Sequence, residues 1–262
     1  MITATGNSKV KRVVQLNQKA KARKEEKVFL VEGLKMFLEA PVEKIRDVYV
    51  TESFYHKDEA CREKLEKCNY EFVSEEVFQK MSDTKTPQGI LCVVEQMNYR
   101  LEEMLQVENP LFVLLEDLQD PGNLGTIIRT GEGAGITGVI MTQNTVDIYN
   151  PKTIRATMGS IYRVPFLYIN DVKETFMQLH KKGIQTYAAH LKGENYYNHY
   201  SFQGGTAFLI GNEGSGLQKE TADMATAYLK IPMEGQVESL NAAIATSLLM
   251  YEARRQRNGG NR

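Results

Sequence analysis

Residues 111–115 form an uninterrupted apolar run, Leu-Phe-Val-Leu-Leu. A strand that is apolar at every position has both faces buried, which is typical of a parallel sheet with helices on either side. The stretch that follows alternates short apolar runs with longer amphipathic segments, so it predicts an α/β domain with a parallel sheet. We expect further strands near residues 138–141, 164–169, 184–189, 206–211 and 228–231, and helices near residues 123–134, 151–158, 172–182 and 240–256.

A second alternating region precedes this run. Strands are expected at residues 28–31, 45–50, 70–73 and 90–94. Helices are expected between them, at residues 33–39, 56–67 and 74–81. Ser74 is suited to cap the helix that follows it, because a serine side chain accepts a hydrogen bond from an unpaired amide of the first turn. A polar stretch that ends in Asn109-Pro110 separates the two regions. The chain therefore predicts two α/β domains, residues 1–98 and 110–262, joined by a linker over residues 99–109.

Cysteine and histidine usage argues against a structural metal site. Cys61, Cys68 and Cys92 form neither a Cys-x-x-Cys pair nor an even disulfide framework, and the four histidines are scattered. Cys61 and Cys68 are expected to share the buried face of one helix. No stretch approaches the roughly 18 consecutive apolar residues of a membrane span, and the first residues lack the pattern of a signal peptide. We therefore expect a cytoplasmic protein with no metal and no membrane partner.

Positive charge is concentrated near the N-terminus. Between Ser8 and Lys27, eight basic residues stand against Glu25 and Glu26, a local net charge of +6, so the rest of a chain whose total is −1 carries −7. Four arginines follow the last apolar residues, at positions 254, 255, 257 and 262. A basic arm on an acidic body suits a polyanionic partner such as RNA, whose phosphates it would neutralise. A merely solvated helix face explains the N-terminal charge equally well.

The glycine clusters do not form the common nucleotide-binding motifs. The glycines of residues 131–135 fall at the end of an expected helix and lack the spacing of the dinucleotide fingerprint. Gly211 and Gly216 have the spacing of a P-loop, but Leu217-Gln218 replaces the lysine and hydroxyl residue that grip phosphate and magnesium. Neither NAD binding nor ATP hydrolysis is therefore supported.

Three segments combine polar residues with the ends of expected strands. Residues 123–129 read Asn-x-Gly-x-x-x-Arg, residues 211–216 read Gly-Asn-Glu-x-x-Gly, and residues 231–241 read Ile-Pro-Met-x-Gly-x-x-x-Ser-Leu-Asn. In this order and combination they resemble the three signature motifs of the SpoU (TrmH) family of RNA ribose 2'-O-methyltransferases, within the SPOUT superfamily. The resemblance covers about the last 150 residues. The preceding region resembles the α/β substrate-binding domain that is often fused to this catalytic domain.

The resemblance implies a fold, a cofactor and an assembly. The catalytic domain, residues 110–262, is expected to be an α/β fold whose C-terminal chain forms a trefoil knot, preceded by a smaller α/β domain that binds RNA. It is also expected to bind S-adenosylmethionine, largely through backbone groups, and to form a homodimer. The expected cofactor-binding residues are Leu191, Gly211, Asn212, Gly216, Ile231, Met233 and Leu240.

Five polar residues match the family's catalytic positions: Arg129, Asn123, Glu213, Ser239 and Asn241. A guanidinium holds its proton too tightly to serve as a base, so we expect Arg129 to stabilise negative charge on the target phosphate or on the ribose oxygen. Glu213 is expected to orient Arg129, while Ser239 and Asn241 position the nucleotide. Asn123 and Asn241 also lie where helix caps are expected, and a cap and a substrate contact can coexist.

The aromatic segment 196–200 has two interpretations. Tyr196, Tyr197, His199 and Tyr200 either stack on RNA bases or pack at the edge of the sheet.

Several functions remain open on this fold. A non-catalytic RNA-binding factor for ribosome assembly is one alternative, and an enzyme that methylates a base is another, although the Ile-Pro-Met and Ser-Leu-Asn motifs favour ribose. A separate N-terminal domain with a basic arm favours large-subunit ribosomal RNA as the substrate, and a transfer RNA 2'-O-methyltransferase is the alternative. No DNA partner is expected.

Overall fold

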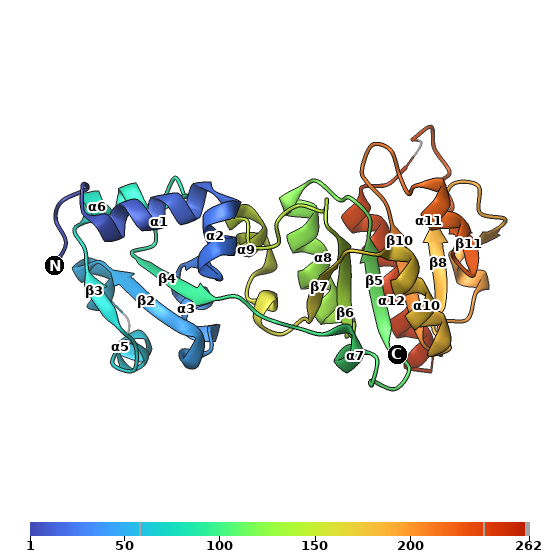
Figure 1. The fold of residues 1–262 in the computed structure, drawn as a ribbon, viewed down its shortest axis with the longest axis horizontal. Coiled ribbons are helices and arrows are strands. Elements are labelled where there is room, and N and C mark those ends of the chain that lie inside the picture. Colours follow the sequence, from blue (N-terminus) through green and yellow to red (C-terminus); the bar gives the residue numbers. More distant parts are fainter. Residues whose placement is uncertain (58, 238, 260–262) are drawn as a thin grey trace. The chain divides into compact units, whose positions relative to one another are not determined.

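A computed structural model describes residues 1–57, 59–237 and 239–259 and divides the chain into two compact units (Figure 1). The first unit consists of Met1–Met97 together with Asp147–Tyr162. The second consists of Asn98–Val146 together with the chain from Arg163 onward. Both units are α/β, as the alternation of apolar runs predicts.

The first unit contains a four-stranded mixed sheet in the order β1, β4, β2, β3. Its strands are β1 (Val28–Glu32), β2 (Ile45–Val50), β3 (Tyr70–Phe72) and β4 (Ile90–Glu95). Its helices are α1 (Ser8–Gln18), α2 (Ala20–Glu26), α3 (Leu34–Glu39), α4 (Glu52–Tyr55), α5 (Glu59–Leu65), α6 (Glu75–Met81) and α9 (Pro151–Thr157). Ser74 caps α6 as expected, because its hydroxyl oxygen accepts a hydrogen bond from the Val77 amide at 3.3 Å.

The expected helix over residues 56–67 is wrong in its bounds, because α4 ends at Tyr55, before this stretch, and α5 spans only Glu59–Leu65. Cys61 is buried on α5, but Cys68 lies beyond the end of that helix and is only half-buried. All three cysteines are free thiols.

The basic N-terminal segment is folded into the first unit. Helix α1 buries Val10, Val13 and Leu16 in a cluster with residues of α6 and the sheet. Four of the eight cations form ion pairs inside the unit: Lys9 with Glu71, Arg12 with Glu26 and Asp47, Lys21 with Glu25, and Arg23 with Asp147. The segment is therefore a pair of packed helices and not an extended arm.

Two segments belong to different units than the sequence suggests. Residues 147–162, expected in the C-terminal domain, pack in the first unit, where the Tyr149 ring lies 4.8 Å from the Phe29 ring and the Tyr149 hydroxyl accepts a hydrogen bond from the Met97 amide at 2.8 Å. The expected linker, residues 99–109, contains helix α7 (Leu101–Met104), whose buried Leu101 and Met104 join the core of the second unit. Each segment is held in its unit by a few buried side chains in an otherwise polar stretch of sequence, Tyr149 and Ile154 in the first segment and Leu101 and Met104 in the second.

The second unit contains a seven-stranded sheet in the order β7, β6, β5, β10, β8, β11, β9, in which every pair is parallel. Its strands are β5 (Leu111–Leu115), β6 (Gly138–Thr142), β7 (Phe166–Ile169), β8 (Gln185–Ala189), β9 (Asn195–Tyr196), β10 (Thr206–Ile210) and β11 (Ala227–Lys230). Its other helices are α8 (Pro121–Ala134), α10 (Val172–Lys181), α11 (Lys219–Asp223) and α12 (Ala242–Arg257). Strand β5 is buried at all five positions, which confirms the assignment of the apolar run to a central parallel strand.

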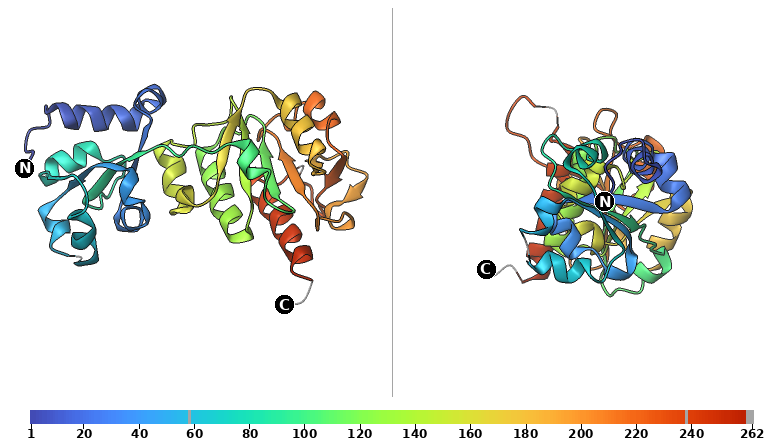
Figure 2. Two further views of the ribbon diagram at one scale, coloured as in Figure 1. Left: turned by 60° about the horizontal axis from the view of Figure 1, so that its bottom comes forward. Right: turned by 90° about the vertical axis from the view of Figure 1, so that its left-hand side faces the viewer.

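The order of the strands brings distant segments together. Strand β10 follows β8 in the chain but inserts between β5 and β8, and α12 then packs beside α8 (Figures 1 and 2). This path is consistent with the trefoil knot that the resemblance implies. Because all strands are parallel, the loops after β5, β8, β10 and β11 meet at one edge of the sheet. Within the described ranges, no helix is both long and apolar enough to cross a membrane.

Candidate active site

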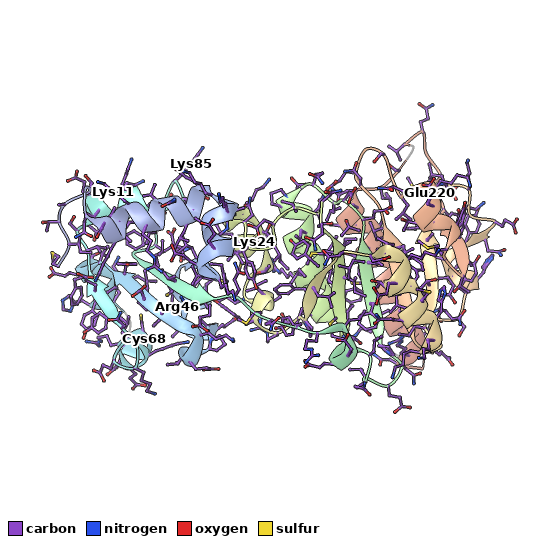
Figure 3. All side chains as sticks on the ribbon, viewed as in Figure 1. Lys11, Lys24, Arg46, Cys68, Lys85 and Glu220 are labelled. Atoms are coloured by element: carbon purple, nitrogen blue, oxygen red, sulfur yellow. The ribbon has the colours of Figure 1, made fainter. Side chains whose placement is uncertain are left out.

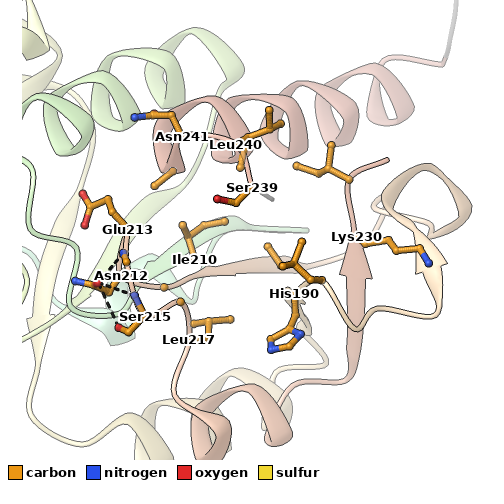
Figure 4. A pocket seen from close by; sticks show the side chains of 18 of the residues that line it. His190, Ile210, Asn212, Glu213, Ser215, Leu217, Lys230, Ser239, Leu240 and Asn241 are labelled. Carbon is orange, nitrogen blue, oxygen red and sulfur yellow. Dashed lines mark hydrogen bonds between the residues drawn. The ribbon is translucent and has the colours of Figure 1, made fainter. Parts of the chain in front are cut away.

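A cavity of about 490 Å³ lies at the carboxyl ends of β8, β10 and β11 and at the start of α12 (Figure 4). All seven residues expected to contact the cofactor line this cavity: Leu191, Gly211, Asn212, Gly216, Ile231, Met233 and Leu240. Its volume lies within the range of about 300–1,000 Å³ that is usual for sites of small organic ligands. The topology thus brings three separate sequence segments around one ligand-sized space.

The loop of residues 211–217 forms one wall of the cavity and is held by its own backbone. Asn212 and Gly216 exchange two backbone hydrogen bonds of 3.1 and 2.9 Å. A Cβ atom at Gly211 would lie 2.1 Å from the carbonyl carbon of Gly216, so this close approach of two backbone segments requires glycine. The loop therefore presents backbone atoms to the cavity at close range.

The Asn212 side chain shapes this loop. Its Oδ1 accepts hydrogen bonds from the amides of Gly214 at 2.9 Å and Ser215 at 3.1 Å, and its Nδ2 donates to the Asp117 carbonyl at 2.9 Å (Figure 4). Because these contacts use both ends of the side-chain amide, Asn212 contributes to the cavity through the loop conformation that it stabilises.

Glu213 binds the start of α8 and does not contact Arg129, contrary to the expected pairing. Its carboxylate accepts hydrogen bonds of 3.0 Å each from the Gln119 amide, the Asp120 amide and the Asn123 Nδ2. Burial alone would raise the pKa of Glu213, but these hydrogen bonds to the charged form outweigh it and lower the pKa. Glu213 is therefore ionised at neutral pH and is a weak base.

Asn123 and Asn241 extend this network to α12. The Asn241 Oδ1 caps α12 by accepting from the amides of Ala243 at 2.9 Å and Ile244 at 3.3 Å, which confirms the expected cap. Its Nδ2 donates to the Asn123 Oδ1 at 2.9 Å. A carboxylate only accepts hydrogen bonds and a backbone amide only donates them. Glu213 at one end of this series of hydrogen bonds and the α12 amides at the other therefore determine the orientation of both asparagine side-chain amides. The network joins the loop after β10 to the first turns of α8 and α12.

The expected cap of α8 at Asn123 is wrong. Asp120 caps this helix, with its Oδ1 accepting from the Asn123 amide at 2.7 Å. The helix begins earlier than expected because Pro121, which lacks an amide hydrogen, is well suited to the first helical position. Asn123 therefore lies inside the first turn, with its side chain free to bind Glu213 and Asn241.

Arg129 and Ser239 differ in their relation to the cavity. Ser239 lines it, together with Glu213 and Asn241. Arg129 lies on α8, exposed and outside the cavity wall. Among the residues that the structure describes, none forms a hydrogen bond or an ion pair with its guanidinium. Of the five catalytic candidates, three thus line the cavity, and Asn123 is hydrogen-bonded to two of these, Glu213 and Asn241. The arginine is left available to an external anion.

The chemistry of the cavity fits an organic cofactor. Apolar side chains such as Leu191, Ile210 and Leu240 line it together with the backbone of the 211–217 loop. Over the described parts of the chain, no group of three or more histidine, cysteine, aspartate or glutamate residues could hold a metal ion. Apolar walls with a few oriented polar groups are the usual composition of a small-molecule site.

Comparisons with known proteins identify the family. The model of the SpoU rRNA Methylase family matches residues 110–251, and the model of the MRM3-like substrate binding domain matches residues 7–92. The chain belongs to the SpoU methylase family. The 23S rRNA (guanosine(2553)-2'-O)-methyltransferase RlmP of Bacillus subtilis is 32% identical to it over 97% of this chain and 98% of that protein.

Solved structures with the same fold contain the expected cofactor. An AdoMet-bound rRNA methyltransferase from Sinorhizobium meliloti is 33% identical, with a TM-score of 0.85 and 97% coverage of both chains. AviRb from Streptomyces viridochromogenes, also in complex with AdoMet, is 26% identical, with a TM-score of 0.88 and coverage of 97% of this chain and 100% of that one. In contrast, a TrmH/SpoU tRNA modifying enzyme from A. aeolicus covers 62% of this chain and 84% of its own, with a TM-score of 0.53 and 26% identity.

These findings establish the protein as an RNA methyltransferase of the SpoU family that uses S-adenosylmethionine, with a SPOUT-type α/β fold preceded by a substrate-binding domain.

The cavity also contains residues that the motifs did not identify. His190, which directly follows β8, lines it and stacks on the Tyr228 ring at 5.2 Å. Its Nδ1 accepts a hydrogen bond from the Lys192 amide at 3.0 Å, which organises the turn after the strand. Lys230 lines the cavity at the end of β11. Their position at the carboxyl ends of parallel strands was a signal available in the sequence.

The aromatic segment 196–200 divides into two parts. Tyr200 packs 5.2 Å from the Tyr187 ring and donates its hydroxyl to the Tyr228 carbonyl at 2.8 Å, so it belongs to the sheet edge. Tyr196 is 41% exposed, and the Lys230 ammonium lies 5.1 Å from its ring centroid. The His199 ring lies 5.8 Å from the Tyr196 ring and is also exposed, so these two residues of the cluster are open to a ligand.

The Gly211→Ala variant should lose cofactor binding, because the added methyl group would force Gly211 and Gly216 apart and open the 211–217 loop. We expect the dissociation constant for S-adenosylmethionine, measured by calorimetry, to rise by at least about tenfold, as overpacking typically costs about 1–3 kcal/mol. Gly214→Ala is the matched control, since a Cβ atom there would make only an ordinary 3.5 Å contact with the Asn212 Oδ1. Equal affinities for the two variants would contradict this account of the loop.

Proposed function

We propose that the protein transfers a methyl group from S-adenosylmethionine to a ribose 2'-hydroxyl of large-subunit ribosomal RNA. The observation that carries the proposal is the hydrogen-bonded network of Glu213, Asn123 and Asn241 beside a ligand-sized cavity. The substrate is supported by RlmP, which is named as a 23S rRNA methyltransferase and is similar along nearly the whole chain. The tRNA modifying enzyme instead covers 62% of the chain. We also propose a cytoplasmic location, where ribosomal RNA is found.

The protein must help a weakly nucleophilic hydroxyl to react. The cofactor supplies an electrophilic methyl group on a sulfonium. We assign Arg129 to the target phosphate or to the oxygen on which negative charge develops, because a guanidinium is a cationic hydrogen-bond donor and that of Arg129 has no other partner among the described residues. Glu213 is a positioning residue, since three hydrogen bonds occupy its carboxylate and its lowered pKa makes it a poor base. Ser239 and Asn241 then hold the nucleotide at the mouth of the cavity.

Replacing Arg129 with alanine should abolish methylation without loss of stability, because the exposed side chain makes no contact that the fold needs. We expect the methylation rate to fall by at least about 100-fold, in line with the loss of a well-placed charge donor. Cofactor affinity should be unchanged, and Arg129→Lys should also fail because an ammonium lacks the planar fork.

Mapping of 2'-O-methyl sites in total RNA from cells with the wild-type gene, the Arg129→Ala gene or no gene gives the readout. The site should disappear from large-subunit ribosomal RNA in the last two strains. Lys173→Ala is the control, because it removes an exposed cation from α10 of the same unit. A modified site in transfer RNA would favour the alternative substrate, and no lost site would favour a non-catalytic assembly factor.

The first unit is proposed to capture RNA through lysines of α1 and α2. Lys9, Arg12 and Arg23 are engaged in ion pairs within the unit, and Arg23 is only 3% exposed. The other five cations are exposed to solvent: Lys11, Lys19, Lys21, Lys24 and Lys27. Lys21 pairs with Glu25 at the surface, and Figure 3 labels Lys11 and Lys24. Deletion of residues 1–97 is a poor test, because it would uncover Tyr149 and other residues of the 147–162 segment.

The triple variant Lys11→Gln, Lys19→Gln, Lys24→Gln should bind RNA with a weaker dependence on salt. Each phosphate contact that is lost reduces the slope of log affinity against log salt concentration by about 0.7–0.9. The measurement is filter binding to large-subunit ribosomal RNA over a range of salt concentrations. A matched triple variant of the exposed Lys173, Lys181 and Lys182 keeps the wild-type slope. Equal slopes for both triples would mean that the N-terminal lysines are only solvated.

We also propose a homodimer formed through α12. Its outer face carries Ile244, Leu248 and Tyr251, which are 52%, 39% and 48% exposed and lie on one side of the helix at spacings of four and three residues. A second copy of the chain is the proposed occupant, as the family resemblance implies. Because Asn241 caps the start of this helix, a dimer contact would lie beside the active site.

Leu248→Asp should therefore shift the protein from dimer to monomer in analytical ultracentrifugation and reduce methylation. The reason is that a carboxylate at the centre of an apolar contact loses its hydration. Met177→Asp on α10, where the methionine is 58% exposed, is the control and should leave the mass unchanged. A wild-type protein that sediments as a monomer would contradict the proposal.

A further inference from the structure

Glu116 is a buried carboxylate that lies outside the cavity wall. It directly follows strand β5 and is 3% exposed. Carboxylates are rarely buried this deeply unless their oxygens are fully hydrogen-bonded, because burial removes their hydration. The contacts of Glu116 therefore indicate what the charge stabilises.

Both carboxylate oxygens bind the segment that follows the cofactor loop. One oxygen accepts a hydrogen bond from the Gln218 amide at 2.7 Å, and the other accepts from the Thr221 hydroxyl. Gln218 is the N-cap residue of α11, but its own side chain makes no capping hydrogen bond. Glu116, which directly follows β5, accepts instead from the amide of this N-cap residue and from the Thr221 hydroxyl in the first turn, and negative charge is favourable at this end of a helix.

The backbone of the same residue binds the other end of the loop. The Glu116 amide donates to the Ile210 carbonyl at 2.9 Å, and Ile210 is the last residue before Gly211. Gln218 is the first residue after Leu217. The two ends of the 211–217 loop are thus both attached to Glu116. The next carbonyl, of Asp117, accepts from the Asn212 side chain inside the loop.

We infer that Glu116 is a positioning residue for the cofactor, which holds the 211–217 loop in its binding conformation before the cofactor arrives. A loop with both ends attached loses less conformational entropy on binding, so its affinity for the ligand is higher. Glu116 touches neither the cavity nor the reacting atoms and acts only through the loop. The inference rests on the proposed function to the extent that this cavity binds S-adenosylmethionine.

The test replaces Glu116 with glutamine, which keeps the size of the side chain but removes its charge and one acceptor oxygen. We expect the dissociation constant for S-adenosylmethionine, measured by calorimetry, to rise by at least about tenfold, since a hydrogen bond to a charged group contributes about 1.5–3 kcal/mol. The KM for RNA and the kcat at saturating cofactor should stay within about threefold of wild type. Amides of residues 212–218 should exchange hydrogen faster in the cofactor-free protein.

Two further variants complete the experiment. Thr221→Val removes one donor and leaves the other, so we expect a smaller rise in the same dissociation constant, and this variant serves if Glu116→Gln does not fold. Glu220→Gln is the control, because it removes an equal charge from an exposed position on the same helix (Figure 3) and should not change cofactor affinity.

The outcomes are distinguishable. Wild-type cofactor affinity and wild-type loop exchange in a folded Glu116→Gln protein would overturn the inference. Equal losses in cofactor affinity, RNA KM and kcat, together with a lower Tm, would also overturn it, because they indicate a general structural role. Failure of the wild-type protein to bind S-adenosylmethionine would instead overturn the proposed function.

Discussion

The parallel pairing of β10 between β5 and β8 is the constraint on which the active site depends. It aligns Ile210 with Leu115, so the residues that follow these two strands leave the sheet side by side. Because parallel strands end at the same edge, the loop after β10 meets the segment that leads into α8. The hydrogen bonds that join the loop after β10 to Glu116, Asp117 and the start of α8 follow from this alignment.

The polar network at the cavity runs from the Glu213 carboxylate to the first amides of α12, and these two ends fix which group donates each hydrogen bond between them. Glu213 can only accept and the α12 amides can only donate, so the two asparagines between them have one satisfactory orientation. The network couples the cofactor loop to the helix that carries Arg129 and to the helix proposed to form the dimer. Hydrogen bonds of 3.0 and 2.9 Å thus connect these three elements directly.

Much of the fold was predictable because its elements have strong local signals. The bounds of β2 and β5 agree with their apolar runs, and Ser74 and Asn241 cap the helices that follow them. The start of α8 was misplaced because two competing cap residues, Asp120 and Asn123, lie within one turn. The 147–162 segment was assigned to the wrong unit because its helical pattern does not reveal which sheet covers Tyr149.

The sequence by itself determined the family and seven of the residues that line the cavity, because motif residues are identified by type and spacing alone. Only the tertiary structure decided what those residues bind. Glu213 contacts the start of α8, more than ninety residues earlier in the chain, and Glu116 contacts Gln218, about a hundred residues later. Hydrogen bonds over such separations depend on strand order and register, and no local pattern of residues specifies either.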